Sequence, residues 1–481
     1  MKIKHVMVLG LWILGANLFA QIRPKQEKPN IILIMADDLG YAGLSSFGGI
    51  GIKTPELDHL VENGIKCTSF YSNAPVCTPT RVALLTGRYQ QRVGLDHLYY
   101  PCIDGDGLDP KKHIVLASQL KKAGYYTGVF GKWHLGDEEK YRPKSHGFDE
   151  FTGFLDGNID FISHHNTRSK EDWWIDHKLK NEEGYVTTLL NNAAVNFIEN
   201  NHKAPFFLYL PHAAVHVPMQ GPDDPALRTN EYWQYRVDKK MTDEVYMRRY
   251  SDMMTSVDKG VGRIMATLKK YNIEENTLII FISDNGGEER GVTAGNVNGG
   301  LRGYKGTMYE GGIKVPALFY WKETLKPGLV NKDVMLSMDI FPTILHLAGI
   351  KEDKTLKPDG VNLWRSLKKG KNIKKRDLFW MHKERVVMRS KNLKLIIQNS
   401  DVELYDLSKD PKELVDLSEN IAYKKDLDEM LIKSKNWHKE TAIGFPLERV
   451  LGKDLKIPWP CGRNLEEYNK NIKAIPSYNL E

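Results

Sequence analysis

Four short apolar runs constrain the fold of this 481-residue chain more than any other feature of its sequence. Each has the length of a strand and no alternation of polar and apolar residues, which is typical of strands buried on both faces of a sheet. Segments of helical periodicity separate them, for example 115–123, 187–199 and 247–271. This order predicts an α/β fold with a parallel sheet and right-handed crossovers. The runs are 30–35, 126–130, 206–210 and 277–282.

The sequence changes character near residue 370. A basic stretch, 368–376, is followed by short strand-like pieces at hairpin spacing and by a helical pattern over 424–439. We therefore expect one large α/β domain in residues 21–370. Residues 371–481 are expected to form a smaller subdomain of antiparallel sheet plus helix that ends in an irregular tail.

The first twenty residues have the pattern of a secretory signal peptide. Lys2 and Lys4 precede an apolar run, 6–14, and small residues lead up to a cleavage site after Ala20. The run is shorter than the ~20 residues that span a bilayer, so we expect a cleaved signal peptide, 1–20, and no transmembrane anchor. The protein is therefore predicted to be exported, either periplasmic or secreted.

Composition excludes several classes of protein. A chain that is 41% hydrophobic and 27% charged is not disordered, and four cysteines are too few for a disulfide-rich scaffold. The 68 basic and 61 acidic residues are well mixed, which argues against a nucleic-acid partner.

Polar side chains follow each of the four apolar runs. Ligands of open α/β sheets bind outside the carboxyl ends of the strands, so these side chains are expected to share one site. Asp37, Asp38, Asp284 and Asn285 would offer an all-oxygen ligand set, which Ca²⁺ or Mg²⁺ prefers, although either pair taken alone favours a turn after the strand. The other strand-end residues are Lys132, His134, His212 and His216.

Cys77 stands beside a predicted helix, because Thr78 suits the N-cap and Pro79 the first helical position. A helix N-terminus favours anions, and Arg81 would add a second positive group. A lone cysteine can also be a small buried hydrophobe, and no histidine adjoins Cys77 in the sequence to activate it.

The segment from Cys77 to Arg88 contains C-T-P-T-R followed by L-T-G-R, which resembles the signature of the type I sulfatases. These form the arylsulfatase-like branch of the alkaline-phosphatase superfamily. The resemblance implies a mixed, mostly parallel sheet between helices and a sulfatase activity (hydrolysis of sulfate esters). It covers nearly the whole chain after the signal peptide, because further segments match in order: 29–40, 131–136, 283–286, 305–306, 310–312, 404–407 and 410–411.

The same resemblance implies a modified residue and a metal. Cys77 would be converted to Cα-formylglycine by a formylglycine-generating or sulfatase-maturating enzyme. The hydrate of this aldehyde would attack sulfur, giving a sulfated hemiacetal. The implied ion is Ca²⁺, with Mg²⁺ possible, and its implied ligands are Asp37, Asp38, the modified Cys77, Asp284 and Asn285.

Catalytic roles also follow from the resemblance. Arg81, Lys132 and Lys305 would hold the sulfate oxygens. His216 would protonate the leaving oxygen with help from Lys305, and His134 would deprotonate the hemiacetal so that it expels sulfate. His216 is chosen over His212 because it precedes x-Pro, which leaves His212 as a pocket residue. Arg88 and Thr86 would orient the formylglycine loop from behind.

The substrate is expected to be a sulfated carbohydrate, such as a glycosaminoglycan or another sulfated polysaccharide fragment. An insertion, 156–177, combines tryptophans with polar groups in a manner that suits a sugar, but it could equally be a loop packed down by its tryptophans. Residues 94–107 could line the opposite wall. The predicted substrate contacts are Asp160, His164, His165, Arg168, Trp174, His97 and His212.

Two alternatives stay open. The first is a phosphodiesterase or phosphonate monoester hydrolase on the same fold. The pair Lys132 and Lys305 favours a sulfate ester over a phosphate ester as the substrate. The second is an inactive carbohydrate-binding pseudoenzyme, against which the complete set of charged positions argues. With Cys77 set aside, the remaining cysteines can form at most one disulfide within the chain; they are Cys67, Cys102 and Cys461.

Overall fold

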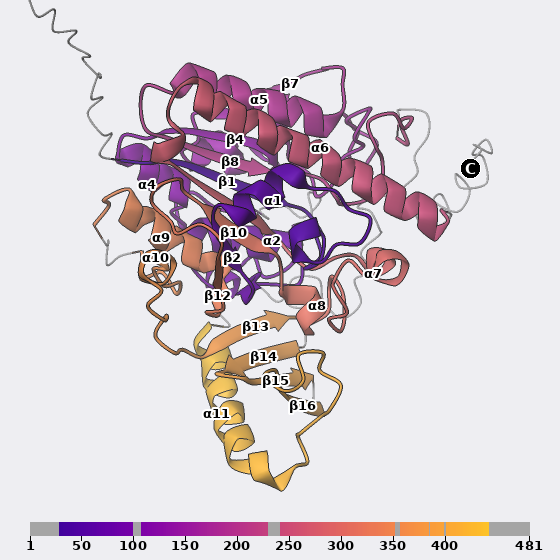
Figure 1. Ribbon diagram of the computed structural model, residues 1–481, viewed down its shortest axis with the longest axis vertical. Coiled ribbons are helices and arrows are strands. Elements are labelled where there is room, and N and C mark those ends of the chain that lie inside the picture. Colours follow the sequence, from indigo (N-terminus) through magenta and orange to yellow (C-terminus); the bar gives the residue numbers. More distant parts are fainter. Residues whose placement is uncertain are drawn as a thin grey trace, which may run out of the picture.

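The computed structural model describes residues 28–99, 107–228, 241–351, 356–383, 385–398 and 401–441. A ten-stranded sheet forms its centre, in the order β11-β2-β10-β9-β1-β8-β4-β5-β6-β7 (Figure 1). The four predicted strands are confirmed as its contiguous middle. They run parallel to one another, and every residue of the central strand, β1, is buried. In order across the sheet they are β9 (Thr277–Ser283), β1 (Asn30–Ala36), β8 (Phe206–Pro211) and β4 (Tyr126–Lys132).

The outer strands make the sheet mixed, as expected. One parallel strand, β5, extends it beyond β4, whereas β10 joins β9 in the antiparallel sense. These strands are β5 (Glu150–Phe154), β6 (Trp174–Ile175), β7 (Lys178–Leu179), β10 (Ala317–Tyr320), β2 (Ile65–Cys67) and β11 (Leu329–Asn331). A separate parallel pair consists of β3 (Phe70–Tyr71) and β12 (Met335–Leu336).

Helices cover both faces of the sheet, and alternate residues of β1 point into the two cores. Ile32 and Ile34 pack with α1 (Pro55–Glu62), α5 (Val186–Asn201) and α6 (Asp243–Lys270). Ile31 and Leu33 pack on the other face with α2 (Cys77–Thr86), α4 (Leu116–Lys122) and α9 (Ile340–Leu347). The short helices are α3 (Gln90–Val93), α7 (Glu289–Gly295), α8 (Glu310–Ile313) and α10 (Trp364–Lys369).

A smaller lobe follows, at the bottom of Figure 1. Its antiparallel sheet and single long helix match the predicted C-terminal architecture. The helix, α11 (Lys424–Thr441), packs on the sheet through Leu427 and Met430. The strands are β13 (Leu378–His382), β14 (Arg385–Ser390), β15 (Leu393–Gln398) and β16 (Asp401–Asp406).

Several predictions lie outside the described residues, namely the signal peptide, the tail beyond residue 443, Cys102 and Cys461. Cys67 is a buried free thiol on β2. Among the described residues, none of the helices has the length and apolar character that crossing a membrane requires.

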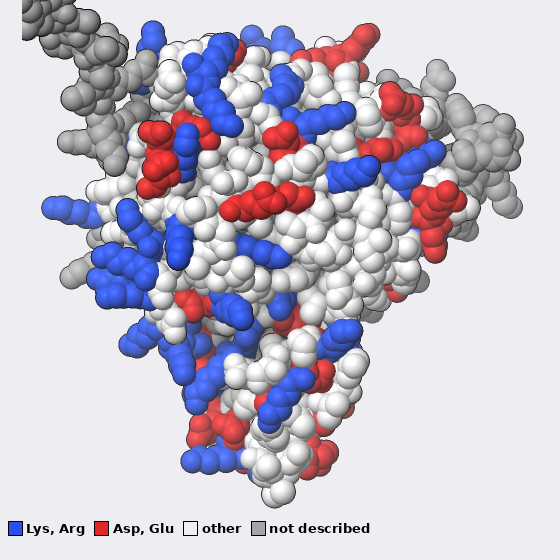
Figure 2. Space-filling model, in the orientation of Figure 1, with Lys and Arg blue, Asp and Glu red and all other residues white. Residues whose placement is uncertain are grey.

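Basic and acidic side chains are interspersed over the face in Figure 2, and basic ones gather on its left edge at the height of α9 and α10.

Candidate active site

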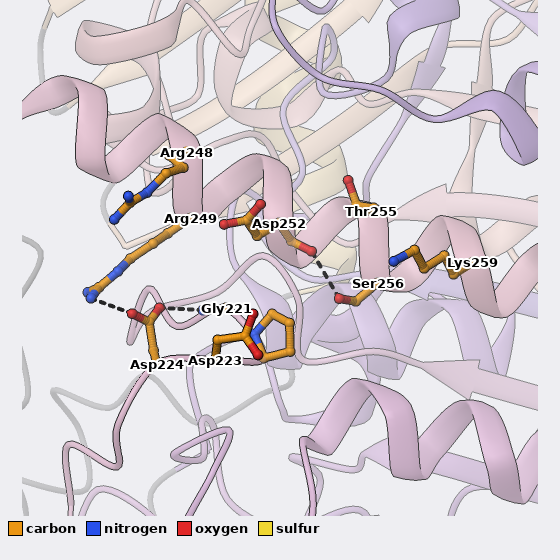
Figure 3. Close-up of a pocket in the computed structure, with 10 residues that line it drawn as sticks. Gly221, Asp223, Asp224, Arg248, Arg249, Asp252, Thr255, Ser256 and Lys259 are labelled. Carbon is orange, nitrogen blue, oxygen red and sulfur yellow. Dashed lines mark hydrogen bonds and ion pairs between the residues drawn. The ribbon is translucent and has the colours of Figure 1, made fainter.

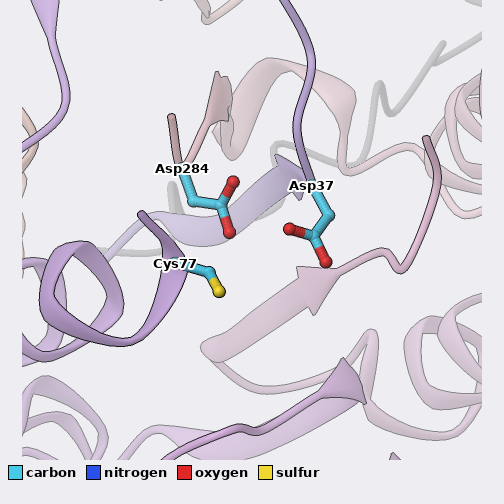
Figure 4. A group of neighbouring side chains, drawn as sticks. All are labelled: Asp37, Cys77 and Asp284. Atoms are coloured by element: carbon cyan, nitrogen blue, oxygen red, sulfur yellow. The ribbon is translucent and has the colours of Figure 1, made fainter. Parts of the chain in front are cut away.

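The carboxyl ends of the four central strands bring the predicted side chains together. Asp37 follows β1, Lys132 ends β4, and Asp284 follows β9. Cys77 enters from α2, and in Figure 4 its sulfur points toward the carboxylates of Asp37 and Asp284. One ligand atom from each of these three side chains lies within 4.8 Å of the other two, and all three are buried.

The helix that carries Cys77 begins two residues earlier than expected, so Pro79 is not its first helical residue. Val76 is its N-cap, so Cys77 is the first helical residue and Thr78 is the second. The predicted N-cap role of Thr78 is wrong because its hydroxyl has other partners. Thr78 Oγ1 donates to the His134 carbonyl at 3.2 Å and accepts from Tyr99 N at 3.1 Å.

The acidic cluster has the features of a cation site. Asp37 Oδ1 and Asn285 Oδ1 are buried and have no hydrogen-bond partner among the described residues. Burial, reinforced by Asp284, raises the pKa of Asp37 well above its ordinary value. Asn285 Nδ2 donates to Asp38 Oδ1 at 2.8 Å, so the amide oxygen of Asn285 is the atom that can bind a cation. Buried carboxylate and amide oxygens without partners fit a hard divalent cation such as Ca²⁺.

Three buried or largely buried cations face these carboxylates. Arg81 donates from Nη2 to Asp284 Oδ2 at 2.7 Å, and Lys132 donates from Nζ to Asp37 Oδ2 at 2.7 Å. Burial alone would raise the pKa of Asp284, but Arg81 and Lys132 outweigh it and hold that pKa below its ordinary value. Lys305 Nζ donates to Asp38 Oδ2 at 2.7 Å. Each carboxylate therefore has a cationic partner at 2.7 Å, and Arg81 Nη2 also lies 3.8 Å from Asp37 Oδ1.

His134, 57 residues further along the chain, lies beside Cys77. Its Nδ1 lies 3.3 Å from Cys77 Sγ. Burial, with Lys132 nearby, lowers the pKa of His134 well below its ordinary value and keeps the imidazole neutral. The backbone of His134 is left-handed, with φ of 56°, and such conformations cluster at active sites. Gly157 packs on the ring, since a Cβ there would lie 2.7 Å from His134 Nε2.

His216 lies beside Asp38. Its Nε2 is 3.6 Å from Asp38 Oδ2, and its Nδ1 is 2.6 Å from the Val217 carbonyl. Because a carbonyl can only accept, Nδ1 carries a proton and Nε2 faces the site. Burial and the charge of Lys305 lower the pKa of His216 well below its ordinary value.

The structure does not bring every predicted residue to Cys77. His212 is fully buried, neither of its ring nitrogens has a hydrogen-bond partner among the described residues, and burial lowers its pKa to about 3. Thr86 Oγ1 donates to the Val82 carbonyl within α2. Arg88 follows the far end of this ten-residue helix, which is about 15 Å long. Orientation of the Cys77 loop by Thr86 and Arg88 stays a prediction.

Three predicted substrate contacts are engaged in folding the insertion. The Asp160 carboxylate accepts backbone N–H bonds from its own loop and from residues 227–228. His164 Nε2 lies 2.8 Å from the Gly184 carbonyl, and His165 Nδ1 lies 2.9 Å from the Ser163 carbonyl. Trp173 is fully buried, so a tryptophan packs the insertion onto the domain. This agrees with the alternative that the insertion is a packed loop.

The other predicted contacts are more open. Arg168 is one-quarter exposed and lies 3.5 Å from Asp137 and 3.9 Å from Asp156. Trp174 is partly exposed, and the guanidinium carbon of Arg142 lies 4.2 Å from the centroid of the Trp174 ring. His97 lies 3.5 Å from Asp96 in the segment that leads to Tyr99.

One residue near the site, Glu288, was missed at the level of sequence, and another, Tyr99, belongs to the predicted wall segment, 94–107. The Tyr99 ring stands edge-on to His134 with centroids 6.2 Å apart, and its hydroxyl bonds to Asp137. Glu288 Oε1 accepts a bond from Lys305 Nζ at 3.2 Å. Its position three residues after Asn285 was the available signal, since residues next to a ligand segment are held near the site.

A further hollow of about 410 Å³ lies against α6 (Figure 3). Arg249, on its wall, donates to Asp224 Oδ1 at 2.6 Å and to the Met219 carbonyl at 3.2 Å. The second bond fixes the backbone three residues after His216. The side chains that line the hollow have mixed charge, so they define no single ligand class.

The fold and this cluster of side chains are those of an alkaline-phosphatase-like hydrolase. The profile of the family described as Sulfatase matches residues 29–350, and that described as N-sulphoglucosamine sulphohydrolase, C-terminal, matches residues 303–439. The chain therefore belongs to the sulfatase family, whose members are sulfuric ester hydrolases.

Named relatives agree with this assignment. The chain is 33% identical to arylsulfatase J of Mus musculus, over 74% of this chain and 59% of that protein. It is 32% identical to N-acetylgalactosamine-6-sulfatase of Rattus norvegicus, over 74% of this chain and 68% of that protein. The alignments thus span about three-fifths to two-thirds of these relatives.

Among solved structures, that of Ps i-CgsB is similar over nearly the whole chain. The TM-score is 0.77 with 30% identity, covering 94% of this chain and 99% of that one. The complex of Ps i-CgsB with k-i-k-neocarrahexaose gives a TM-score of 0.76 with 29% identity.

Proposed function

We propose that the protein is an exported sulfatase that removes sulfate from carbohydrates, with a formylglycine derived from Cys77 and a bound Ca²⁺. One observation carries the proposal: Cys77 Sγ lies among buried carboxylates and cations at the strand ends, 3.3 Å from His134 Nδ1. A sugar substrate is supported by the names of the N-acetylgalactosamine-6-sulfatase relative and the Ps i-CgsB oligosaccharide complex. Export rests on the signal-like pattern of residues 1–20.

Conversion of Cys77 is supported by its surroundings. Burial raises the pKa of the Cys77 thiol, so the unmodified side chain is a poor nucleophile at neutral pH. Formylglycine would supply a carbon that bears two oxygens when hydrated, one of which can attack sulfur. A dedicated maturation enzyme is thus an expected partner during biogenesis.

Asp37, Asp38, Asp284 and Asn285 would hold the cation, together with an oxygen of the modified Cys77. Bound Ca²⁺, or Mg²⁺, would supply positive charge that polarises the sulfate group. Arg81 and Lys132 hold the pKa of Asp284 below its ordinary value. With the cation bound, the same two side chains would bind sulfate oxygens in this buried site.

The two histidines would transfer protons at different atoms of the site. His134 Nδ1 can take a proton from an oxygen carried by residue 77, at the position that Sγ now occupies. His216 keeps its Nδ1 proton on the Val217 carbonyl and directs Nε2 at the site. A bound anion favours the imidazolium form, from which Nε2 can protonate the leaving oxygen with Lys305 close by.

A comparison of turnover on sulfate and phosphate esters tests this proposal against the alternative of a phosphate-ester hydrolase. Turnover of a nitrophenyl sulfate and of sulfated mono- and disaccharides would be compared with turnover of a phosphate diester and a phosphonate monoester of the same phenol. We expect sulfate release to dominate. Dominant phosphorus–oxygen cleavage would contradict the proposal, and no turnover of any ester by fully converted enzyme would favour the carbohydrate-binding alternative.

Metal removal tests the cation site. Treatment with a chelator should abolish sulfate release, and Ca²⁺ should restore it. The melting temperature should fall in parallel, because Asp37, Asp38 and Asp284 would lose the ion that offsets their repulsion. In an Asp37→Asn variant, addition of Ca²⁺ should raise the melting temperature much less. Activity and melting temperature that are both insensitive to the chelator would contradict the site.

A further inference from the structure

We infer that the C-terminal lobe positions Lys305 in the active site and that Arg302 is the residue through which it acts. Lys305 lies in a loop, residues 302–310, which we call the lysine loop. Four residues of the C-terminal lobe contact its two ends; they are Lys394, Glu403, Tyr405 and Glu413. The inference rests on the role of Lys305 in the proposed function.

The tip of the lysine loop is a tight turn tied to the catalytic centre. Thr307 Oγ1 bonds to both the amide and the carbonyl of Tyr304. Lys305 N donates to the Gly287 carbonyl at 2.9 Å, and Gly306 N donates to the Pro75 carbonyl at 2.8 Å. The tip therefore spans the segments that carry Asn285 and Cys77, and small movements of its stems would move Lys305.

Arg302 joins the two stems of this loop to the C-terminal lobe. Its Nη1 donates to the Tyr405 hydroxyl at 2.9 Å and to the Glu413 carbonyl at 2.7 Å. Its guanidinium lies 3.8 Å from the ring centroid of Tyr309, on the opposite stem. One side chain thus fixes both stems against β16 and the turn after it.

The second stem has its own buried attachment. The backbone amide of Glu310 donates a hydrogen bond to Glu413 Oε2 at 2.7 Å, which fixes the end of this stem. Lys394 Nζ lies between Glu310 Oε1, at 3.0 Å, and Glu413 Oε1, at 2.8 Å, and all three side chains are at most 2% exposed. Buried ion pairs of this kind add little net stability but penalise other arrangements strongly, so they specify geometry.

This geometry matters most for steps in which Lys305 takes part. Lys305 Nζ is held between Asp38 Oδ2, at 2.7 Å, and Glu288 Oε1, at 3.2 Å. A displacement of about 1 Å can cost on the order of 100-fold in rate. Because Lys305 assists departure of the leaving oxygen, its displacement should slow the hydrolysis of esters with basic leaving groups more than that of esters with acidic ones.

The test is an Arg302→Met variant assayed with aryl sulfates whose leaving groups span a range of pKa. We expect kcat to fall about 10- to 100-fold for the most basic leaving group and much less for the most acidic, with a smaller effect on KM. Lys305→Ala should show the same trend, and the double variant should be no slower than Lys305→Ala alone. Arg263→Met, which removes an Arg–Asn192 bond of 2.6 Å on α6, is the matched control and should leave the trend unchanged.

The outcomes separate this inference from the proposed function. A Lys305→Ala variant with the expected trend, beside an Arg302→Met variant with a uniform or additive loss, would overturn the inference alone. A Lys305→Ala variant without any trend would overturn the role of Lys305 and the inference together. If Arg302→Met does not fold, Tyr405→Phe makes the same comparison by removing one hydroxyl, and absence of the trend there would also overturn the inference.

Discussion

At the scale of single residues, the site is a balance of buried charges. Asp37, Asp38 and Asp284 face three cations at 2.7 Å each. With all three carboxylates ionised, the side chains alone are close to neutral, and a divalent cation would make the site net positive. A positive, water-excluding pocket binds a sulfate ester and stabilises the charge that develops as it is cleaved.

Lys132 tests this balance at one position. Lys132→Ala should lower kcat/KM for sulfate esters by about 100- to 1,000-fold, because it removes a preorganised cation and leaves Asp37 without its partner. The measurement is steady-state kinetics on a sulfated sugar. Lys121→Ala, which removes a cation from an exposed pair with Asp149, serves as the control and should keep full activity. An active Lys132→Ala variant would contradict the assigned role.

At the scale of elements, strand ends supply most of the site and loops complete it. Four parallel strands end at one edge of the sheet, which is why residues far apart in sequence meet there. The insertion over 156–177 then packs against the site, since Gly157 touches the His134 ring. Its Asp172 accepts backbone bonds from Leu155 and Asp156, which shape the segment beside His134.

Asp172 gives this insertion a predicted pH dependence. Burial, reinforced by Asp156, raises the pKa of Asp172 from 3.8 to about 7. A raised carboxyl pKa contributes stability that is fully present below about pH 4 and is lost as the pH rises through 7. Asp172→Asn should therefore lower the melting temperature overall but flatten its decline between pH 5 and 8. The exposed Asp428→Asn should leave the decline unchanged; an equal decline in the wild type and Asp172→Asn would contradict the account.

At the scale of the whole molecule, the two lobes share a core. Trp380, on β13, is fully buried among residues of both lobes and donates from Nε1 to the Ser72 carbonyl at 2.8 Å. Tyr71 and Met338 of the large lobe lie in the same cluster. Together with the contacts of Arg302, this makes the C-terminal lobe part of the catalytic unit.

Trp380→Ala should therefore destabilise the whole protein. Removal of a buried tryptophan costs about 3–5 kcal/mol, so the melting temperature should fall in a single transition seen by both far-UV circular dichroism and sulfatase activity. Trp364→Ala on α10, where the ring is partly exposed, should cost less. Loss of the C-terminal lobe in a separate transition, with activity retained, would contradict the shared core.

The central strands and the strand-end residues could be predicted because continuous apolar runs and the topological rule both leave a sequence signal. Outer strands such as β6 and β11 have two or three residues, too few for a pattern. The approach of His134 to Cys77 joins residues 57 apart and depends on packing alone. The substrate-contact role of Asp160 stays a prediction, because composition does not distinguish a carboxylate that folds a loop from one that binds a sugar.

The central claim is that Cys77 is the precursor of the nucleophile, and mass spectrometry of the tryptic peptide 67–81 tests it most directly. The protein would be produced with increasing amounts of a maturation enzyme, and each preparation would be assayed for sulfate release from a sulfated sugar. We predict that activity rises in proportion to the fraction of peptide that carries the aldehyde at position 77 and is zero without it. Full activity in a preparation whose Cys77 is entirely the thiol would contradict the account.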